Sequence, residues 1–182
     1  MDTIEKIVQN ENVHILLNHE DIKQKVIALG KEITTDYEGK EVVLVGVLTG
    51  CFIFMADLCR EIDLDVEISF LQISSYGDEM KSSGKVTVKQ ELKSDIEGKH
   101  VIIVEDIVDS GHSLHFLLDY LNEKKPASIK TVALLNKPNA HKVDINVDYI
   151  GFNISDEFVI GYGLDVAKKK RNLKNIYQVI TE

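Results

Sequence analysis

The most chemically suggestive part of this sequence is a nine-residue run that follows the apolar stretch VIIV at 101–104. The run reads Glu105, Asp106, Ile107, Val108, Asp109, Ser110, Gly111, His112 and Ser113. A helix that starts at the end of this run would leave its first backbone N–H groups free, and these groups favour an anion. The second half of the run therefore suits a phosphate. Carboxylates only accept hydrogen bonds, so Glu105 and Asp106 suit a ribose diol or a hard cation. A phosphorylated sugar bound with Mg²⁺ would satisfy both halves.

The same residues also have a purely structural interpretation. Asp109 and Ser110 could cap the following helix, and Glu105 and Asp106 could be the solvated end of a strand. The apolar strand before the run and the regular leucine pattern after it favour a binding site. The glycine patterns of dinucleotide-binding and P-loop sites are absent from the sequence, which argues against those two classes.

The elements that must position this run are predicted from the spacing of apolar residues. Helical spacing predicts helices over 20–37 and 52–62, and a third that carries Leu114, Leu117, Leu118 and Leu121. The expected buried face of the second helix consists of Phe52, Met55, Ala56 and Cys59. The expected strands are 42–47, 66–73, 86–88, 101–104, 131–136, 148–152 and 158–163. This order predicts an α/β fold with a mainly parallel central sheet flanked by helices, in which ligands bind beyond the carboxyl ends of the strands.

Length and charge narrow the possible functions. The chain has 182 residues, which fits one compact domain. Its 21 Lys and Arg against 30 Asp and Glu give a net charge of −9, which disfavours non-specific binding to nucleic acid. No apolar segment is long enough to span a membrane and the first residues lack a signal-peptide profile, so we expect a cytoplasmic protein. Cys51 and Cys59 are expected on one helix, about 12 Å apart. This distance is too long for a disulfide, so we expect both to be buried thiols.

The segment VIIVEDIVDSGHSL resembles the phosphoribosyl pyrophosphate (PRPP) motif of type I phosphoribosyltransferases, in which four apolar residues and two acids precede D-[ST]-G-x-[ST]. Four other segments are similar to those of the hypoxanthine-guanine branch: VGVLTGCFIFMADL, SSYGDEMKSSGKV, LLNKPNA and DEFVIGYGLDVAKKKRNL. The resemblance implies the type I phosphoribosyltransferase fold, as a single domain over 1–182. It also implies a flexible catalytic loop over about 75–89 and a small hood built from the chain termini, mainly the N-terminal segment and about 150–182.

The resemblance also implies a role for each matching residue. Asp109 would be the general acid/base beside purine N7. The residues that would bind PRPP and its phosphates are Glu105, Asp106, Ser110, Gly111, His112, Ser113, Leu48, Thr49, Gly50 and Arg171. The residues that would bind the purine are Lys137, through its 6-oxo group, Phe158, by stacking, and Val159, through its backbone. Ser75 and Tyr76 would close over the site from the flexible loop, and Asp165 would ligate Mg²⁺.

Three of these residues also have simpler interpretations. Lys137 could be a solvated turn lysine beside Pro138, and Phe158 could belong to the core. Arg171 ends a basic run over 168–171 that could be a solvated surface. The resemblance favours the functional interpretation for these three, while the lysines of the run remain surface charges. One departure is Thr49, since many members of the family carry Lys at this position.

Taken together, the resemblance implies an enzyme of purine salvage. It would transfer the 5-phosphoribosyl group from PRPP to N9 of hypoxanthine, and also of guanine, giving IMP or GMP and pyrophosphate. Mg²⁺ is the expected cofactor, PRPP and a 6-oxopurine are the expected ligands, and a homodimer or homotetramer is the expected assembly. The alternatives are a xanthine-preferring transferase and a related regulator that binds RNA, which would need a basic surface.

Overall fold

A computed structural model describes residues 13–75 and 86–180 of the chain. The predicted flexible loop therefore lies largely outside the described residues, and Tyr76 is among those not described. The two ends of that loop are regular structure, because Ser75 ends strand β3 (Val66–Ser75) and residues 86–89 belong to strand β4 (Val86–Gln90). β3 and β4 pair as antiparallel neighbours, so residues 86–89 of the predicted loop belong to a strand.

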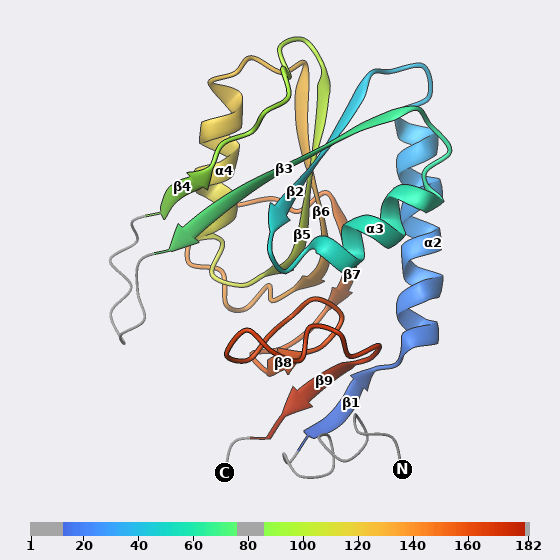
Figure 1. The fold of residues 1–182 in the computed structure, drawn as a ribbon, viewed down its shortest axis with the longest axis vertical. Helices are drawn as coiled ribbons and strands as arrows, with labels where there is room; N and C mark the ends of the chain where they lie inside the picture. The colour runs from blue at the N-terminus through green and yellow to red at the C-terminus, as the bar shows by residue number, and fades with distance from the viewer. Residues whose placement is uncertain (1–12, 76–85, 181–182) are drawn as a thin grey trace.

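The centre of the molecule is a six-stranded sheet in the order β4-β3-β2-β5-β6-β7 (Figure 1). Its other strands are β2 (Val42–Leu48), β5 (His100–Val108), β6 (Ser128–Asn136) and β7 (Tyr149–Asn153). β3, β2, β5, β6 and β7 run parallel, and only β4 is antiparallel. The predicted fold class is confirmed, and the carboxyl ends of the parallel strands share one edge.

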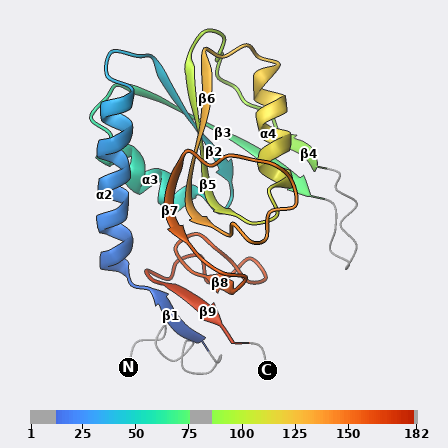
Figure 2. The same ribbon diagram turned by 180° about the vertical axis from the view of Figure 1, so that it is seen from behind.

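Helices cover both faces of this sheet. Helices α2 (His19–Asp36) and α3 (Phe52–Glu61) lie on one face, and α4 (His112–Asn122) lies on the other (Figures 1 and 2). Alternate strand residues divide between the two cores: Leu44 and Ile102 pack toward α2 and α3, whereas Val43 and Val101 pack toward α4. Strands buried on both faces explain the unbroken apolar runs in the sequence. None of the described helices is long and apolar enough to cross a membrane.

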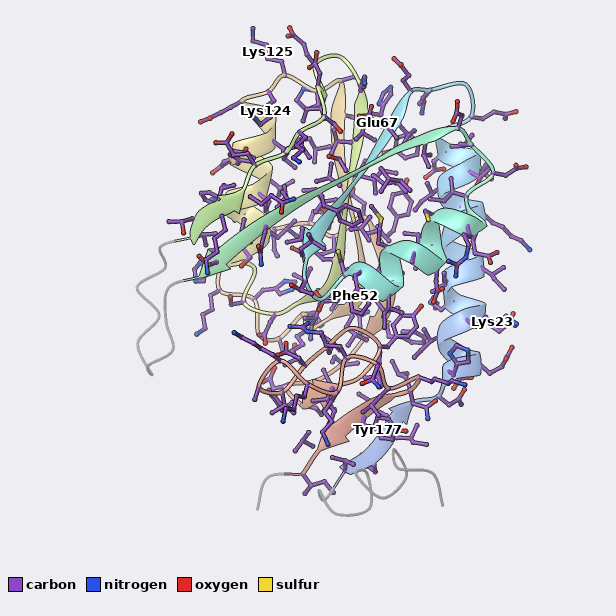
Figure 3. All side chains as sticks on the ribbon, in the orientation of Figure 1. Lys23, Phe52, Glu67, Lys124, Lys125 and Tyr177 are labelled. Atoms are coloured by element: carbon purple, nitrogen blue, oxygen red, sulfur yellow. The ribbon has the colours of Figure 1, made fainter. Side chains whose placement is uncertain are left out.

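The predicted buried face of α3 was right for Met55 but wrong for Phe52 and Ala56, which are exposed, and Cys59 is only partly buried. The buried residues of α3 are Phe54, Met55 and Leu58, whereas Phe52, at the start of the helix, is 41% exposed (Figure 3). The segment Phe52 to Met55 is apolar throughout, so its pattern cannot show which side chains face the sheet. Cys51 is buried as predicted but precedes the helix, and Cys59 is only partly buried.

A second, three-stranded sheet lies beyond the carboxyl ends of the main sheet (Figure 1). It has the order β1-β9-β8 and consists of β1 (Val13–Leu17), β9 (Ile176–Val179) and β8 (Phe158–Ile160). Both neighbouring pairs are antiparallel, so the two ends of the chain meet in this sheet. β7 pairs with β6 in the main sheet, so the C-terminal strands of the small sheet begin at Phe158 and not at about residue 150. The predicted strand 158–163 ends at Ile160, because Gly161, Tyr162 and Gly163 all have positive φ.

Candidate functional site

The run after VIIV spans the end of a strand, a turn and the start of a helix. β5 continues to Val108 and pairs with β6 as far as Asn136, well beyond the expected end at 104. Glu105 is only 7% exposed. Glu105 and Asp106 are therefore part of the sheet and not a solvated strand end, and as successive strand residues they project from opposite faces.

A small pocket lies where β5 meets the start of α4. It has a volume of about 100 Å³ and is lined by Glu105, Ile107, Val108, Asp109, Ser110, Gly111, Ser113 and Leu114. Gly111 has φ 85°, and a Cβ at this position would come within 2.7 Å of the Ile145 side chain. Glycine therefore allows the tight turn that opens α4 beneath the pocket.

The helix start is not capped by the acid and the hydroxyl that precede it. Gly111 is the N-cap residue of α4, and no side chain caps this helix end. The capping interpretation of Asp109 and Ser110 is therefore wrong. The first backbone N–H groups of α4 remain without a side-chain cap beside the pocket, which suits an anionic ligand.

Lys137 and Asp109 meet at the carboxyl ends of the neighbouring strands β6 and β5. The Lys137 Nζ lies 3.2 Å from the Asp109 Oδ2. Only 9% of the Lys137 side chain is exposed, against 56% of the Asp109 side chain. Lys137 is therefore not a solvated turn lysine. The pair offers a buried cation and an accessible carboxylate, which together can bind and exchange protons with a heterocycle.

The residue before Lys137 was not predicted to matter for the site. Asn136 is buried at the end of β6, donates through Nδ2 to the Asn153 Oδ1 at 2.9 Å, and its own Oδ1 lies 2.9 Å from the His141 Nε2. These bonds hold the turn that carries Lys137. The signal in the sequence is a single amide that interrupts an apolar strand immediately before a lysine.

The two adjacent carboxyl groups of β5 are in a low-dielectric environment. Burial raises the pKa of Glu105 well above its ordinary value, and the charge of Asp106 raises it further. Burial also raises the pKa of Asp106, to about 6, although backbone N–H groups and Arg171 lower it. A ligand that donates hydrogen bonds to these two carboxyl groups would therefore stabilise their charged forms.

The loop between β2 and α3 packs directly against Asp106. The peptide bond between Leu48 and Thr49 is cis. A Cβ at Gly50 would lie 1.7 Å from the Asp106 Oδ2, and a Cβ at Gly163 would lie 2.1 Å from the Gly50 carbonyl oxygen. Three segments that are distant in sequence thus meet around Gly50.

Arg171 and Asp165 also belong to this meeting point. The Arg171 Nη2 lies 2.6 Å from the Asp165 Oδ1, and the Arg171 Nη1 donates to the Gly163 carbonyl at 2.6 Å. Asp165 and Arg171 are close enough to influence the pKa of Asp106. Arg171 is therefore not part of a solvated basic run.

The donor set around Asp165 limits which metal could bind. Among residues 13–75 and 86–180, no group of three or more His, Cys, Asp and Glu side chains could hold a metal ion. The Asp165 side chain is 30% exposed. This set fits Mg²⁺, which commonly takes one or two protein carboxylates together with water and substrate phosphates.

The second sheet, beyond the carboxyl ends of the main sheet, contains an exposed aromatic ring. Phe158 begins β8 and is 50% exposed, so its interpretation as a core residue is wrong. Its neighbour Val159 is buried. His112 and Ser113 start α4 and are partly buried, Thr49 is exposed, and Ser75 lies at the end of β3.

Comparison with known proteins agrees with this geometry. Residues 12–167 match the model of the phosphoribosyl transferase domain family. A hypoxanthine-guanine phosphoribosyltransferase of Aquifex aeolicus is 46% identical over 96% of this chain and 98% of its own length. A crystal structure of a hypoxanthine phosphoribosyltransferase from Staphylococcus aureus superimposes with a TM-score of 0.91 at 41% identity, over 96% of this chain and 95% of that chain. A crystal structure of a hypoxanthine-guanine phosphoribosyltransferase from Bacillus anthracis superimposes with a TM-score of 0.88 at 46% identity. The match covers 92% of this chain and 98% of that chain. The chain therefore belongs to the phosphoribosyltransferase family, in its hypoxanthine and hypoxanthine-guanine branch.

Proposed function

We propose that this chain transfers the 5-phosphoribosyl group from PRPP to N9 of hypoxanthine or guanine and releases pyrophosphate. The observation that carries the proposal is the pair of Lys137 and Asp109, 3.2 Å apart beside the pocket at the start of α4. The pair places a proton acceptor and a buried cation next to a site suited to phosphate. Membership of the hypoxanthine branch supports the choice of a 6-oxopurine.

PRPP would occupy the carboxyl edge of the sheet in two parts. The turn from Ser110 to Ser113 would bind the 5′-phosphate through N–H groups and hydroxyls, and Glu105 and Asp106 would accept hydrogen bonds from the ribose. The raised pKa of each carboxyl supports this role, because donors from the ribose would compensate for the burial of charge. Backbone groups from Leu48 to Gly50, together with Arg171, would bind the pyrophosphate.

The purine would lie between Phe158 and the turn after β6. The Lys137 ammonium would donate to the 6-oxo group, the Phe158 ring would stack on the base, and the Val159 backbone would contact its edge. The Asp109 carboxylate would accept the proton from N7 as positive charge develops on the purine. In the free protein the Lys137 Nζ lies 3.2 Å from this carboxylate.

Mg²⁺ bound with pyrophosphate would supply positive charge that stabilises the leaving group. Asp165 would hold it, and Arg171 would orient Asp165 through their 2.6 Å ion pair. The proposal also includes a cytoplasmic location and a homodimer or homotetramer, as the family resemblance implies. Light scattering after size-exclusion chromatography tests the assembly.

The direct test is a nucleotide-formation assay. The protein is mixed with PRPP and MgCl₂, and hypoxanthine, guanine and xanthine are offered separately while IMP, GMP and XMP are quantified. We expect IMP or GMP together with an equimolar amount of pyrophosphate. Exclusive use of xanthine would correct the substrate, and the absence of turnover with all three bases would reject the proposed function.

A further inference from the structure

Tyr162 lies in the turn that leads from β8 to Asp165, and its hydroxyl contacts helix α3. The residue is 3% exposed and has φ 49°, in the left-handed region that non-glycine residues seldom adopt. Its hydroxyl donates to the Asp57 Oδ2 at 2.5 Å. A buried tyrosine hydroxyl is costly without a partner, so this bond fixes where the turn can lie.

Asp57 belongs to α3, the helix that follows the loop from Leu48 to Gly50. Its Oδ2 accepts from Tyr162, and its Oδ1 forms an ion pair with Arg60. Burial, followed by the bond to Asp57, raises the pKa of Tyr162, so the hydroxyl stays protonated and acts as the donor. The bond thus joins the turn to the helix that supports the proposed pyrophosphate loop.

On its other side, the turn touches the pyrophosphate loop itself. A Cβ at Gly163 would lie 2.1 Å from the Gly50 carbonyl oxygen, so the two backbones are in direct contact. The Gly163 N–H donates to the Arg171 carbonyl at 2.9 Å, and its own carbonyl accepts from the Arg171 guanidinium at 2.6 Å. Arg171 in turn pairs with Asp165.

We infer that Tyr162 is a positioning residue: its bond to Asp57 holds the turn that carries Asp165 and Arg171 against the loop from Leu48 to Gly50. It thereby sets the affinity for the pyrophosphate part of PRPP. This inference rests on the proposed function, and it assigns Tyr162 and Asp57 a role without contact to the substrate. The purine side of the site, around Lys137 and Phe158, should not depend on it.

The test is Tyr162→Phe, which removes one hydroxyl and keeps the ring. We expect KM for PRPP to rise by about tenfold, which corresponds to the loss of a charge-assisted hydrogen bond. The dissociation constant for pyrophosphate with Mg²⁺, measured by calorimetry, should rise by the same factor. KM for hypoxanthine at saturating PRPP should stay near the wild-type value. Asp57→Asn keeps one acceptor oxygen, so its effect should be smaller, and adding it to Tyr162→Phe should cost little more.

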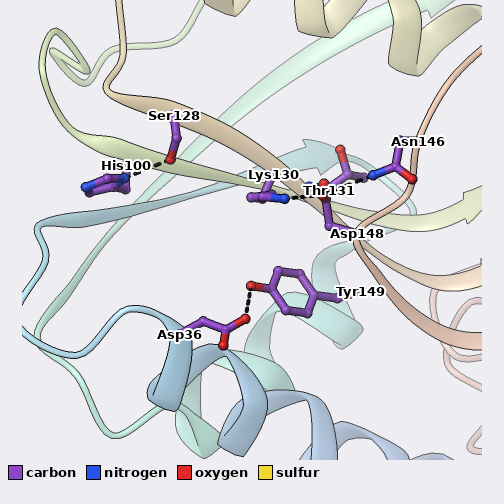
Figure 4. Close-up of polar contacts among 8 residues, drawn as sticks. All are labelled: Asp36, His100, Ser128, Lys130, Thr131, Asn146, Asp148 and Tyr149. Carbon is purple, nitrogen blue, oxygen red and sulfur yellow. Dashed lines mark hydrogen bonds and ion pairs between the residues drawn. The ribbon is translucent and has the colours of Figure 1, made fainter.

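Tyr149→Phe is a matched control. Tyr149 is also a buried tyrosine whose hydroxyl donates to an aspartate of a helix, here the Asp36 Oδ2 at 2.7 Å. Figure 4 shows this bond in a polar cluster at the amino ends of the strands, opposite the site. Tyr149→Phe should lower the melting temperature but leave both KM values and the pyrophosphate affinity unchanged.

The possible outcomes separate the two proposals. Absence of wild-type turnover rejects the proposed function and this inference together. Wild-type turnover with normal PRPP and pyrophosphate affinity in folded Tyr162→Phe rejects only the positioning role, as does an equal rise of KM for PRPP and hypoxanthine. If Tyr162→Phe does not fold, the same criteria apply to Asp57→Ala.

Discussion

Asp109 and Lys137 have unequal surroundings, and this difference suggests separate tasks. The Asp109 carboxylate is accessible to a ligand, whereas the Lys137 ammonium, 3.2 Å away, is buried. Burial of the Lys137 cation carries a desolvation penalty that a single, half-exposed carboxylate offsets only in part. At the end of two buried strands, the pair is better explained by its chemistry.

For Asp109 we predict that Asp109→Asn lowers kcat by about 10²-fold, because an amide keeps the shape but cannot accept the N7 proton. The dissociation constant of PRPP should stay close to that of the wild type. Steady-state rates and calorimetry measure the two quantities. Asp119→Asn, at an exposed position on α4, is the control and should have normal kcat. A normal kcat in Asp109→Asn would contradict the proton-acceptor role.

For Lys137 we predict a selective loss of purine binding. Lys137→Ala removes a charge-assisted hydrogen bond worth roughly 1.5 to 3 kcal/mol, so KM for hypoxanthine should rise by about 10- to 150-fold. KM for PRPP should change much less. Lys130→Ala breaks a different lysine–aspartate ion pair, with Asp148, near the amino end of β6 and far from the site, and should affect neither KM. An equal rise in KM for hypoxanthine and for PRPP would contradict a selective role of Lys137 in purine binding.

For Asp106 the raised pKa predicts a stability cost that depends on pH. The folded-state pKa is about 6, above the ordinary value of 3.8, so the folded protein binds this proton more tightly than the unfolded chain. The contribution of Asp106 to the free energy of unfolding therefore falls as pH rises from about 4 to 6 and is constant above that range. Asp106→Asn should be more stable than wild type at pH 7.5 by on the order of 2 to 3 kcal/mol and should bind PRPP less tightly.

Urea unfolding of both proteins between pH 4 and 7.5 measures this difference. The stability advantage of Asp106→Asn should grow with pH up to about 6. A stability difference that does not vary with pH would mean that the pKa of Asp106 is not raised in the folded protein.

At the scale of elements, the site depends on backbones that approach more closely than side chains would allow. The turn at Gly163 contacts the loop at Gly50, and Gly50 contacts the Asp106 carboxylate of β5. These contacts join a strand end, the loop before α3 and the turn after β8. Any side chain at the contact must push one of the three segments away.

We therefore predict different results for alanine at two glycines that share positive φ. Gly163 has φ 103° and lies against the Gly50 carbonyl, whereas Gly39 has φ 73° and a Cβ there would meet nothing within 4 Å. Gly39→Ala should lower stability by about 1 kcal/mol through backbone strain and leave the kinetics unchanged. Gly163→Ala should lower stability further and raise KM for PRPP by more than about tenfold. Similar kinetics in the two variants would show that the contact at Gly50 does not shape the site.

At the scale of the whole molecule, two sheets meet around the site, and a ligand bound there should stabilise the complete fold. With Mg²⁺ and PRPP at 100 times its dissociation constant, stabilisation should reach about 2.7 kcal/mol. In a domain of this size that raises the melting temperature by roughly 5 to 10 °C. EDTA should abolish both the shift and turnover, as differential scanning fluorimetry and the nucleotide assay would show. Turnover that resists EDTA would reject the metal role of Asp165.

The sequence by itself determined the features that depend on local pattern. Apolar runs such as 101–104 located the buried strands, because a strand covered on both faces has no polar alternation. The run from Glu105 to Ser113 pointed to the candidate site, because acids, hydroxyls and glycine between a strand and a helix suit a ligand at the carboxyl edge of the sheet. The family resemblance, and with it the fold, rests on this run and on four other contiguous segments.

Only the tertiary structure decided features that depend on which surfaces meet. It placed Phe54 and not Phe52 in the core, because a fully apolar segment does not encode its own orientation. It paired β1 with β9 from opposite ends of the chain, and Tyr162 with Asp57 across 105 positions. It also decided that the partly buried Asp106 side chain packs against Gly50, and desolvation there raises its pKa. Burial and long-range hydrogen bonds belong to the packed chain as a whole, so a local sequence pattern can suggest the residues but cannot specify their partners.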